Sequence, residues 1–246
     1  MFTFTPIKTR LVHTPKDEIW DILEALPPLQ DGDILMITSK ILAIHQGRCV
    51  PITQTTKEKL IKQEASYFLP FVHAQGFHVN LTITQNTLIA AAGIDESNAD
   101  GYFVLWPQKV DELCQKIRDF LCKKNGIKNL GILATDSHTT PLRYGVSGIT
   151  IGLAGVKPVK DVRGKEDLFG RKMCMTQINE VDALSSMAVL LMGETDEQTP
   201  IVLLRGYTGI VFDDKATMDD FKIDPELDLY TPLLSVIPKN QDYNSK

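Results

Sequence analysis

Residues 130–136 read Leu130-Gly131-Ile132-Leu133-Ala134-Thr135-Asp136, an apolar run that ends in an aspartate. A second apolar run, from Leu88 to Ile94, ends in the same way at Asp95. Small polar residues follow both aspartates. Strands that run out into polar loops carry their last side chains to a rim where ligands bind, so the two carboxylates predict a shared divalent-cation site. Such a site indicates phosphate chemistry.

The composition is that of an ordinary globular protein. The chain has 246 residues, of which 43% are hydrophobic and 23% are charged. A chain of this length hides about 70% of its unfolded surface, enough for one large domain or two interlocked smaller ones. Its four cysteines lack both CxxC spacing and zinc-ligand spacing with histidine, which indicates buried thiols in a reducing compartment.

Charge and hydropathy exclude several kinds of partner. The start of the chain lacks the order of a signal peptide, and no apolar run approaches the roughly 20 residues of a membrane span, so we expect a cytoplasmic protein without a membrane partner. The formal net charge is -5 and no block of Lys and Arg occurs, which argues against nucleic acid as a partner. Nucleotides remain possible because a metal ion can supply positive charge.

The patterns of apolar residues predict an α+β fold with mixed, largely antiparallel sheets. Helical spacing predicts four helices, over Asp17–Ala25, Thr56–Leu69, Pro107–Cys122 and Val181–Met192. Strands are expected over Ile34–Ile44, in a hairpin from His78 toward Asp95, before Asp136, in a bent or closely packed segment over Gly145–Gly155, and over Ile201–Arg205. Strict βαβ alternation is missing, and the tail Asn240–Lys246 is expected to fray.

Each candidate site residue also has an ordinary structural interpretation. An aspartate after a strand is more often a turn former or a helix cap than a metal ligand. If Asp95 and Asp136 lie close together, they repel by about 4 kcal/mol at about 4 Å, so a cation or a raised pKa must compensate. Ser39 and Lys40 suit phosphate but are also common at an exposed strand end. Neither phosphate-loop motif occurs in the chain.

Three further features also have an ordinary structural interpretation beside a functional one. Asp136-Ser137-His138 contains the letters of a catalytic triad, but neighbours on an extended chain point to opposite faces, which argues against a serine hydrolase. The charged segment Asp161–Arg171 is either a solvated loop or a flap whose arginines grip an anionic substrate. Glu194 follows a predicted helix, where an anion is unfavourable unless a cation balances it.

The motifs, taken in order, resemble those of the coenzyme F-420 gamma-glutamyl ligase family. The resemblance runs from Gly32 to Gly206, and its ordered series is more specific than any single motif. It is carried by Gly32-Asp33, Thr38-Ser39-Lys40, Gly47-Arg48, Ala92-Gly93-Ile94-Asp95-Glu96-Ser97-Asn98, Thr135-Asp136, Pro141 with Arg143 and Gly145, Ile151-Gly152-Leu153-Ala154-Gly155, Arg163-Gly164 with Asp167 and Gly170-Arg171, Met192-Gly193-Glu194 and Arg205-Gly206.

The resemblance implies two interlocked subdomains within one unit over residues 1–246, and an intertwined homodimer. It also implies a GTP-dependent ligase that joins L-glutamate to a carboxylate acceptor with two divalent cations, Mg²⁺ or Mn²⁺. Asp95 and Asp136 would be catalytic and would bind the first ion, and Ser137 and Glu194 the second. The nucleotide contacts that it implies are Leu11, Val12, Ser39, Lys40, Asn98, Met192 and Gly193.

Departures from the family pattern bear on the substrates. Ala43-Ile44-His45-Gln46 stands where the family usually carries a second lysine, so both GTP and ATP remain candidates. Ser137 replaces the usual threonine, and Glu194 replaces a frequent glutamine. The variant is similar to a bacterial branch thought to act in folate metabolism, so the acceptor would be either a folate or the deazaflavin coenzyme F-420-0. The alternative function is a catalytically inactive nucleotide-binding or scaffold homologue.

Overall fold

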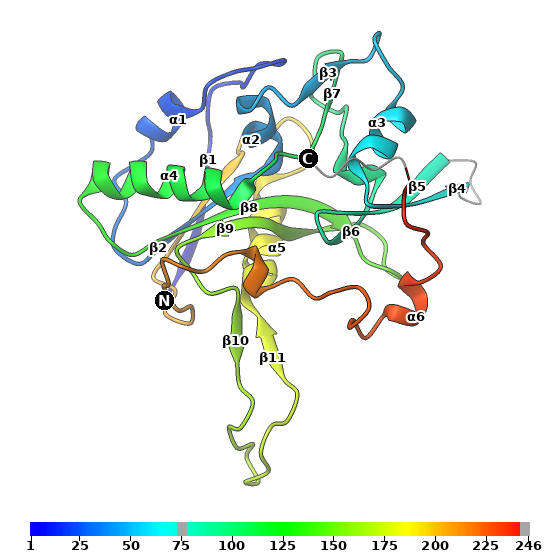
Figure 1. Ribbon diagram of the computed structural model, residues 1–246. Helices are drawn as coiled ribbons and strands as arrows, with labels where there is room; N and C mark the ends of the chain where they lie inside the picture. Colours follow the sequence, from blue (N-terminus) through cyan, green and yellow to red (C-terminus); the bar gives the residue numbers. More distant parts are fainter. Residues whose placement is uncertain (73–77, 242–246) are drawn as a thin grey trace.

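The computed structural model describes residues 1–72 and 78–241, and its centre is a five-stranded sheet (Figure 1). The strand order is β1-β12-β2-β8-β9. Only β2 and β8 are parallel neighbours, and the other three pairs are antiparallel. The strands are β1 (Thr3–Ile7), β2 (Asp33–Thr38), β8 (Leu130–Thr139), β9 (Val146–Ala154) and β12 (Ile201–Arg205). The predicted α+β class with mixed, largely antiparallel sheets is confirmed.

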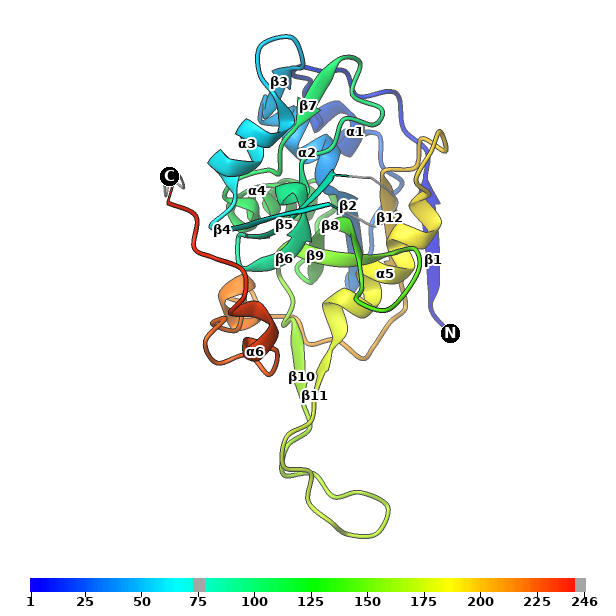
Figure 2. The ribbon, with the colours of Figure 1, turned by 90° about the vertical axis from the view of Figure 1, so that its right-hand side faces the viewer.

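Helices cover both faces of this sheet (Figure 2). On one face, α1 (Trp20–Glu24) and α4 (Val110–Asn125) pack on the sheet and form the larger part of the core. On the other face lies α5 (Glu180–Met192), which begins where the Asn179 side chain accepts a hydrogen bond from the Asp182 backbone. Strands β2 and β8 are buried on both faces, which explains their continuous apolar sequence.

The predicted strand Ile34–Ile44 is wrong in its second half. Strand β2 ends at Thr38, and Ser39 begins helix α2 (Ser39–His45). Five of the seven residues of α2 are buried, so its sequence is as apolar as that of the strand before it. Periodicity cannot separate a buried strand from a buried helix turn in such a run. Ser39 and Lys40 therefore lie on a helix rather than on a strand.

Two other predicted helices have different limits. The first begins at Trp20 rather than at Asp17, because the Asp17 carboxylate accepts hydrogen bonds from Arg10 and from the His13 backbone. Helix α3 (Lys57–Glu64) ends before Leu69, since the chain then enters β4 (Tyr67–Val72). That strand pairs with β5 (His78–Thr84), which forms the predicted hairpin with β6 (Thr87–Ala90).

Smaller elements complete the chain. Residues 49–104 contain β3, α3, β4, β5, β6, a 3₁₀ turn and β7, and they are inserted between α2 and α4. The short elements are β3 (Cys49–Pro51), η1 (Ala91–Gly93), β7 (Tyr102–Val104), β10 (Val159–Asp161), β11 (Gln177–Asn179), η2 (Met218–Asp220) and α6 (Thr231–Leu234). The division into two interlocked subdomains stays a prediction.

The glycine-rich segment is a strand to which other elements approach closely, as predicted. A Cβ atom at Gly148 would lie 2.2 Å from the Ser185 carbonyl oxygen of α5, and one at Gly152 would lie 2.3 Å from Val110 of α4. The pairing of β8 with β9 also shifts register between Ala134 and Thr135. Glycine is required at these two positions because the helices pack directly on the strand backbone.

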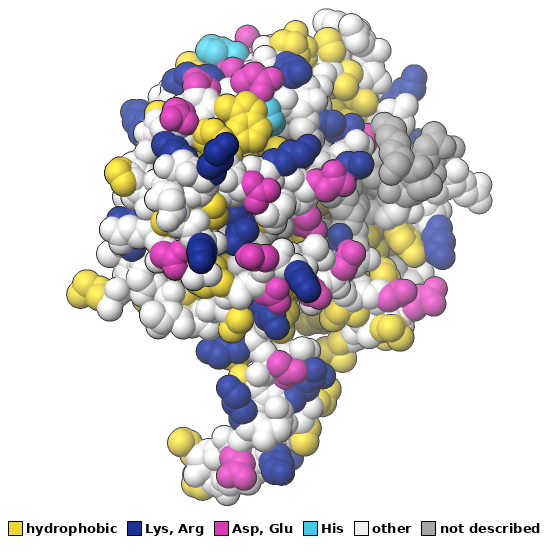
Figure 3. Space-filling model, turned by 60° about the vertical axis from the view of Figure 1, so that its left-hand side comes forward, with side chains coloured by type: hydrophobic (Ala, Val, Ile, Leu, Met, Phe, Trp, Pro, Cys, Tyr) yellow, Lys and Arg dark blue, Asp and Glu magenta, His cyan; other side chains and the backbone are white. Residues whose placement is uncertain are grey.

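Strands β10 and β11 form the base of an arm that projects from the body (Figure 1). The segment Asp161–Arg171 lies on this arm, where Arg163 pairs with Asp161 at 2.6 Å. Leu168, Phe169 and Met175 are almost fully exposed there. The face shown in Figure 3 has basic and acidic side chains interspersed over the body, with the arm below.

The expected frayed tail falls mostly on residues 242–246, which lie outside the described residues. Asn240 is anchored, because its side-chain amide donates hydrogen bonds to the Lys62 and Ala65 carbonyls. Within residues 1–72 and 78–241, no helix is both long and apolar enough to cross a membrane.

Candidate active site

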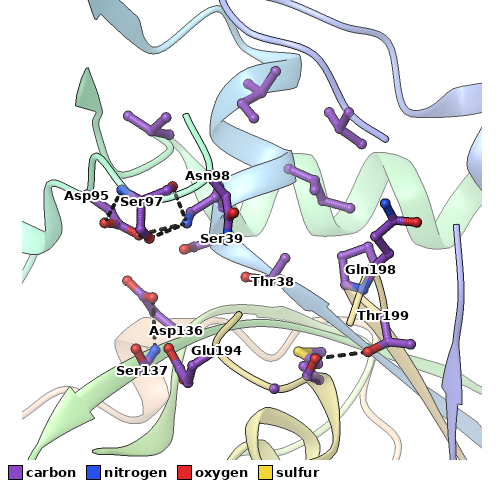
Figure 4. Close-up of a pocket in the computed structure, with 18 of the residues that line it drawn as sticks. Thr38, Ser39, Asp95, Ser97, Asn98, Asp136, Ser137, Glu194, Gln198 and Thr199 are labelled. Atoms are coloured by element: carbon purple, nitrogen blue, oxygen red, sulfur yellow. Dashed lines mark hydrogen bonds and ion pairs between the residues drawn. The ribbon is translucent and has the colours of Figure 1, made fainter. Parts of the chain in front are cut away.

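A cleft of about 310 Å³ opens at the end of the parallel strand pair (Figure 4). Thr38 of β2 lies opposite Thr135 of β8, so the residues that follow, Ser39 and Asp136, emerge at the same edge of the sheet. The carboxyl ends of adjacent parallel strands are the usual place for a ligand site in a sheet, because the loops there diverge. The single parallel pair therefore sets the position of the cleft.

All of the site residues predicted from the sequence line this cleft. They come from five separate stretches of the chain, which the fold brings together. The residues are Leu11, Val12, Ser39, Lys40, Asp95, Asn98, Asp136, Ser137, Met192, Gly193 and Glu194.

Asp95 lies in the loop after η1 and is surrounded by donors. Lys40 Nζ lies 2.7 Å from its Oδ2 atom, and the Ser97 hydroxyl donates to the same oxygen at 2.7 Å. The backbone N–H groups of Glu96 and Ser97 donate to Oδ1 at 2.7 and 2.9 Å. Burial by itself would raise the pKa of Asp95, but the hydrogen bonds from Lys40 and Ser97 outweigh it and lower the pKa to about 2.

Asp136 lies within β8, just beyond the last residue that pairs with β2, and β8 continues to Thr139 rather than ending at this aspartate. Its position is more enclosed than that of Asp95. The Ser137 backbone N–H donates to Oδ1 at 2.8 Å, and the Trp106 indole N–H donates to Oδ2. Burial raises the pKa of Asp136 to about 6, although these two donors act in the opposite direction. The negative charge of Asp95 contributes to the rise, so the two carboxylates sense one another across the cleft.

Glu194 and Ser137 lie beside each other on the third side of the site (Figure 4). Partial burial raises the pKa of Glu194, and the negative charge of Asp95 raises it further. Lys40 and a hydrogen bond with Ser137 act against this rise. Glu194 follows α5, as predicted, and it lines the cleft together with Asp95 and Asp136.

The loop after α5 closes one side of the cleft. Asn98 donates from its side-chain amide to the Thr195 carbonyl at 2.8 Å, which joins the Asp95 loop to this second loop. Gly193 has a φ of +76°, and a Cβ atom there would lie 2.2 Å from the Glu197 carboxyl group. Thr199 donates to the Met192 carbonyl at 2.9 Å. The loop is therefore fixed at both ends.

Leu11 and Val12 belong to the segment after β1 and give the cleft an apolar part, together with Ile41 and Ile44 of α2. Arg10 holds this segment in place. Its guanidinium donates to Asp17 and Asp21 and to the Leu11 and Glu18 carbonyls, at distances from 2.6 to 3.1 Å. An apolar surface beside polar groups suits a flat ring with a charged tail.

The donors of the cleft suit a hard cation. Carboxylate and hydroxyl oxygens are the ligands that Mg²⁺ and Mn²⁺ prefer, and Asp136 is a partly buried carboxylate that forms no salt bridge with any residue the structure describes. Among residues 1–72 and 78–241, no group of three or more His, Cys, Asp or Glu side chains is close enough to hold an ion by itself. The carboxylates therefore share one cleft without forming a closed cage, and Lys40 balances Asp95.

Some residues of the cleft were missed from the sequence, among them Trp106 and Ser97. Thr195 to Thr199 also line the cleft, and they belong to the segment from Met192 onward that the family resemblance implies for the nucleotide. Ser97 follows Asp95 closely, so its position beside that carboxylate could have been found. Trp106 gave no signal, because its contact with Asp136 joins residues 30 positions apart.

Two features singled out in the sequence lie elsewhere. His138 Nε2 lies 3.3 Å from the Ser147 hydroxyl, so it faces β9 rather than Ser137, in agreement with the argument against a serine hydrolase. None of the residues of the charged arm segment lines the cleft within this chain. The interpretation of that segment as a solvated loop therefore holds for the single chain.

An acidic cleft at the end of the parallel strand pair is a candidate active site, and comparison with known proteins gives the class of protein. Residues 6–206 match the family model described as F420-0:Gamma-glutamyl ligase, so the chain belongs to this family. The resemblance noted in the sequence is thereby confirmed.

Characterised relatives cover most of the chain. It is 32% identical over 193 residues to the coenzyme F420:L-glutamate ligase of Methanocaldococcus jannaschii, an alignment that spans 73% of this chain and 77% of the relative. It is 31% identical over 216 residues to the enzyme of the same name from Methanopyrus kandleri, which spans 82% of this chain and 85% of the relative.

Proposed function

We propose that this protein is a nucleotide- and metal-dependent gamma-glutamyl ligase. It would join the amine of L-glutamate to a carboxylate of an acceptor, with a nucleoside triphosphate as the source of energy. The observation that carries the proposal is the meeting of Asp95, Asp136, Ser137 and Glu194 in one cleft of a chain that belongs to a gamma-glutamyl ligase family.

The reaction needs two steps. An acceptor carboxylate oxygen attacks the γ-phosphorus, and the nucleoside diphosphate leaves, which gives an acyl phosphate. The glutamate amine then attacks the acyl carbon, inorganic phosphate leaves, and the amine gives up a proton. Both steps bring negatively charged groups together, so the main task of the site is to neutralise the negative charge of the phosphate and carboxylate groups.

The carboxylates of the cleft would serve as cation ligands. Asp95 and Asp136 are proposed to hold one divalent ion, and Ser137 and Glu194 a second. When bound, such ions neutralise the charge that develops on the phosphate oxygens. Lys40 adds a positive charge that is already beside Asp95 and can reach a phosphate from the same side of the cleft.

The remaining residues would hold the nucleotide. Ser39 and Lys40 lie at the start of α2, and Asn98 fixes the opposite loop by its bond to the Thr195 carbonyl. Met192 and Gly193 line the floor between them, and Leu11 and Val12 offer the apolar surface for the base. These residues suit the base of GTP and that of ATP alike, so both nucleotides are proposed co-substrates.

The acceptor is proposed to be coenzyme F-420-0 or a folate, which both present a carboxylate. The relatives act on coenzyme F420, as their names state. A homodimer is part of the proposal, and the exposed apolar side chains Leu168, Phe169 and Met175 on the projecting arm support it. Large apolar side chains at the tip of an arm are costly in water and are typical of contacts with a second chain.

Product analysis tests this function. The protein is incubated with L-glutamate, Mn²⁺, GTP or ATP, and either a folate or coenzyme F-420-0, and the products are weighed by mass spectrometry. We expect acceptor-dependent phosphate release and a product heavier by one or more glutamyl residues. Nucleotide binding without acceptor-dependent phosphate release would instead favour the inactive nucleotide-binding homologue.

A further inference from the structure

Trp106 contacts Asp136 and packs on the backbone two residues before Asp95. Its side chain is 3% exposed, and it belongs to the large core cluster that includes Leu35 and Ile37 of β2. It nevertheless lines the cleft, where its indole N–H donates to Asp136 Oδ2. Of the described contacts of Trp106, this one reaches a proposed metal ligand directly.

The same indole also fixes the Asp95 side. A Cβ atom at Gly93 would lie 2.2 Å from Trp106 Nε1 and 2.3 Å from Cε2, so the ring is packed directly on the backbone of residue 93. Gly93 has a φ of +70°, which also favours glycine. Asp95 is two residues further along this backbone, so the ring limits how far its loop can approach Asp136.

Hydrogen bonds tie the backbone next to Trp106 to that of Asp95. Val104 and Asp95 form an antiparallel bridge, with N–H to carbonyl distances of 2.8 and 3.0 Å. Arg48 Nε donates to the Trp106 carbonyl at 3.1 Å, and the Leu105 N–H donates to the Arg48 carbonyl at 2.9 Å. The tryptophan is thereby held at its backbone, at its ring face and at its N–H group.

We propose that Trp106 is a positioning residue for the metal site, which sets the orientation of the Asp136 carboxylate and its spacing from the Asp95 loop. The proposal rests on the proposed function, because it assigns the purpose of the contact to a bound cation. With one oxygen held by the Ser137 N–H and the other by the indole, the Asp136 carboxylate cannot rotate, and its outer lone pairs point in fixed directions. Such partners of a metal ligand typically change metal affinity by about 10- to 100-fold.

Two substitutions separate the N–H group from the bulk of the ring. Trp106→Phe keeps a large ring but removes the donor. Trp106→His places its Nε2 at the ring position of the indole nitrogen and keeps a donor, although it loses the six-membered ring. Mn²⁺ affinity is measured by electron paramagnetic resonance for each purified protein, alone and with GTP or ATP but without acceptor, beside thermal unfolding. Trp20→Phe is the matched control, because Trp20 packs on His45 and Phe120 outside the cleft.

We expect Trp106→Phe to weaken Mn²⁺ binding by at least about 10-fold and Trp106→His to retain most of it, with Trp20→Phe unchanged. Equal loss in Phe and His variants, or none in Phe, would overturn the inference while leaving the metal site in place. If the wild-type protein fails to bind Mn²⁺ under either condition, the proposed function falls and the inference falls with it.

A spectroscopic measurement covers the case in which Trp106→Phe does not fold. The chain has two tryptophans, so Trp106 is the only one left in the Trp20→Phe protein. Mn²⁺ is paramagnetic and quenches an adjacent indole. We expect Trp106 emission to fall with the same midpoint as the resonance titration. Mn²⁺ binding that leaves this emission unchanged would contradict the proposed contact.

Discussion

The two aspartates of the cleft are the same residue type at the ends of similar apolar runs, yet their environments are opposite. Asp95 is half-exposed and has four donors, including Lys40, and its pKa is lowered to about 2. Asp136 is more enclosed and has two neutral donors, and its pKa is raised to about 6. The difference shows that burial and a cationic neighbour, rather than the residue type, set the pKa of a carboxyl group.

The comparison also indicates how the site would take up a cation. Asp95 is already balanced by Lys40, whereas Asp136 holds its charge at a cost in the absence of a cation. A cation should therefore stabilise the charged form of Asp136 more than that of Asp95.

The largest effect is expected from removing either carboxylate. Asp136→Asn and Asp95→Asn should each reduce acceptor-dependent phosphate release by more than about 100-fold, because a lost metal ligand costs at least as much as a lost partner of a ligand. Phosphate release and Mn²⁺ affinity are measured together. Asp119→Asn, on the exposed face of α4, is the control. Full turnover in both cleft variants would contradict the assignment.

The pH dependence of stability should differ between the two aspartates. The folded-state pKa of Asp136 is raised, so its contribution is present below the unfolded-state pKa and is lost as pH rises through about 6. Without metal, the wild-type protein should lose about 1.4 kcal/mol relative to Asp136→Asn between about pH 5 and about pH 8. Urea unfolding of both proteins at the two pH values measures this difference.

The contribution of Asp95 to stability should stay constant over the same pH interval. Its folded-state pKa is lowered, so its contribution is present above the unfolded-state pKa and is lost only as pH falls toward about 2. Its side chain is 46% exposed, and solvent screening reduces this contribution further. If the unfolding free energies of the wild-type protein and Asp136→Asn changed with pH in the same way, the two aspartates would not differ as described.

Removing the cation beside Asp95 should make the two aspartates more alike. Lys40→Met should weaken nucleotide binding by about 10-fold, because a charge-assisted contact to phosphate is lost. Mn²⁺ binding without nucleotide should instead stay equal or tighten by a few-fold, since the lysine no longer competes for Asp95. Calorimetric titrations with each ligand test the opposite signs. A parallel loss of both affinities would contradict this account of Lys40.

The smallest effect is expected at the bond that joins the two loops. Asn98→Ala removes the hydrogen bond to the Thr195 carbonyl, and the KM for nucleotide should rise by about five-fold, which corresponds to about 1 kcal/mol. Asn86→Ala is the matched control. Asn86 also has a positive φ and also donates to one distant carbonyl, that of Ile223, but it lies outside the cleft. Equal KM values for the two variants would remove Asn98 from the nucleotide site.

From the sequence alone, the class of the fold and part of the site could be predicted. Apolar runs that end at Asp95 and Asp136, a glycine-rich strand and the helix before Gly193 were all found from local pattern, because the period and the end of a run are properties of neighbouring residues. The family resemblance then named eleven of the residues that line the cleft.

Only the tertiary structure decided what those residues do to one another. The apolar stretch after Ile34 divides into β2 and α2 because both halves are buried, and burial on all sides leaves no periodic signal. The lowered pKa of Asp95 depends on Lys40, which lies 55 positions away along the chain. The raised pKa of Asp136 depends on its burial, against which the hydrogen bond from Trp106, 30 positions away, acts. Interactions over such separations are set by the packing of the sheet and its helices, and no local pattern encodes them.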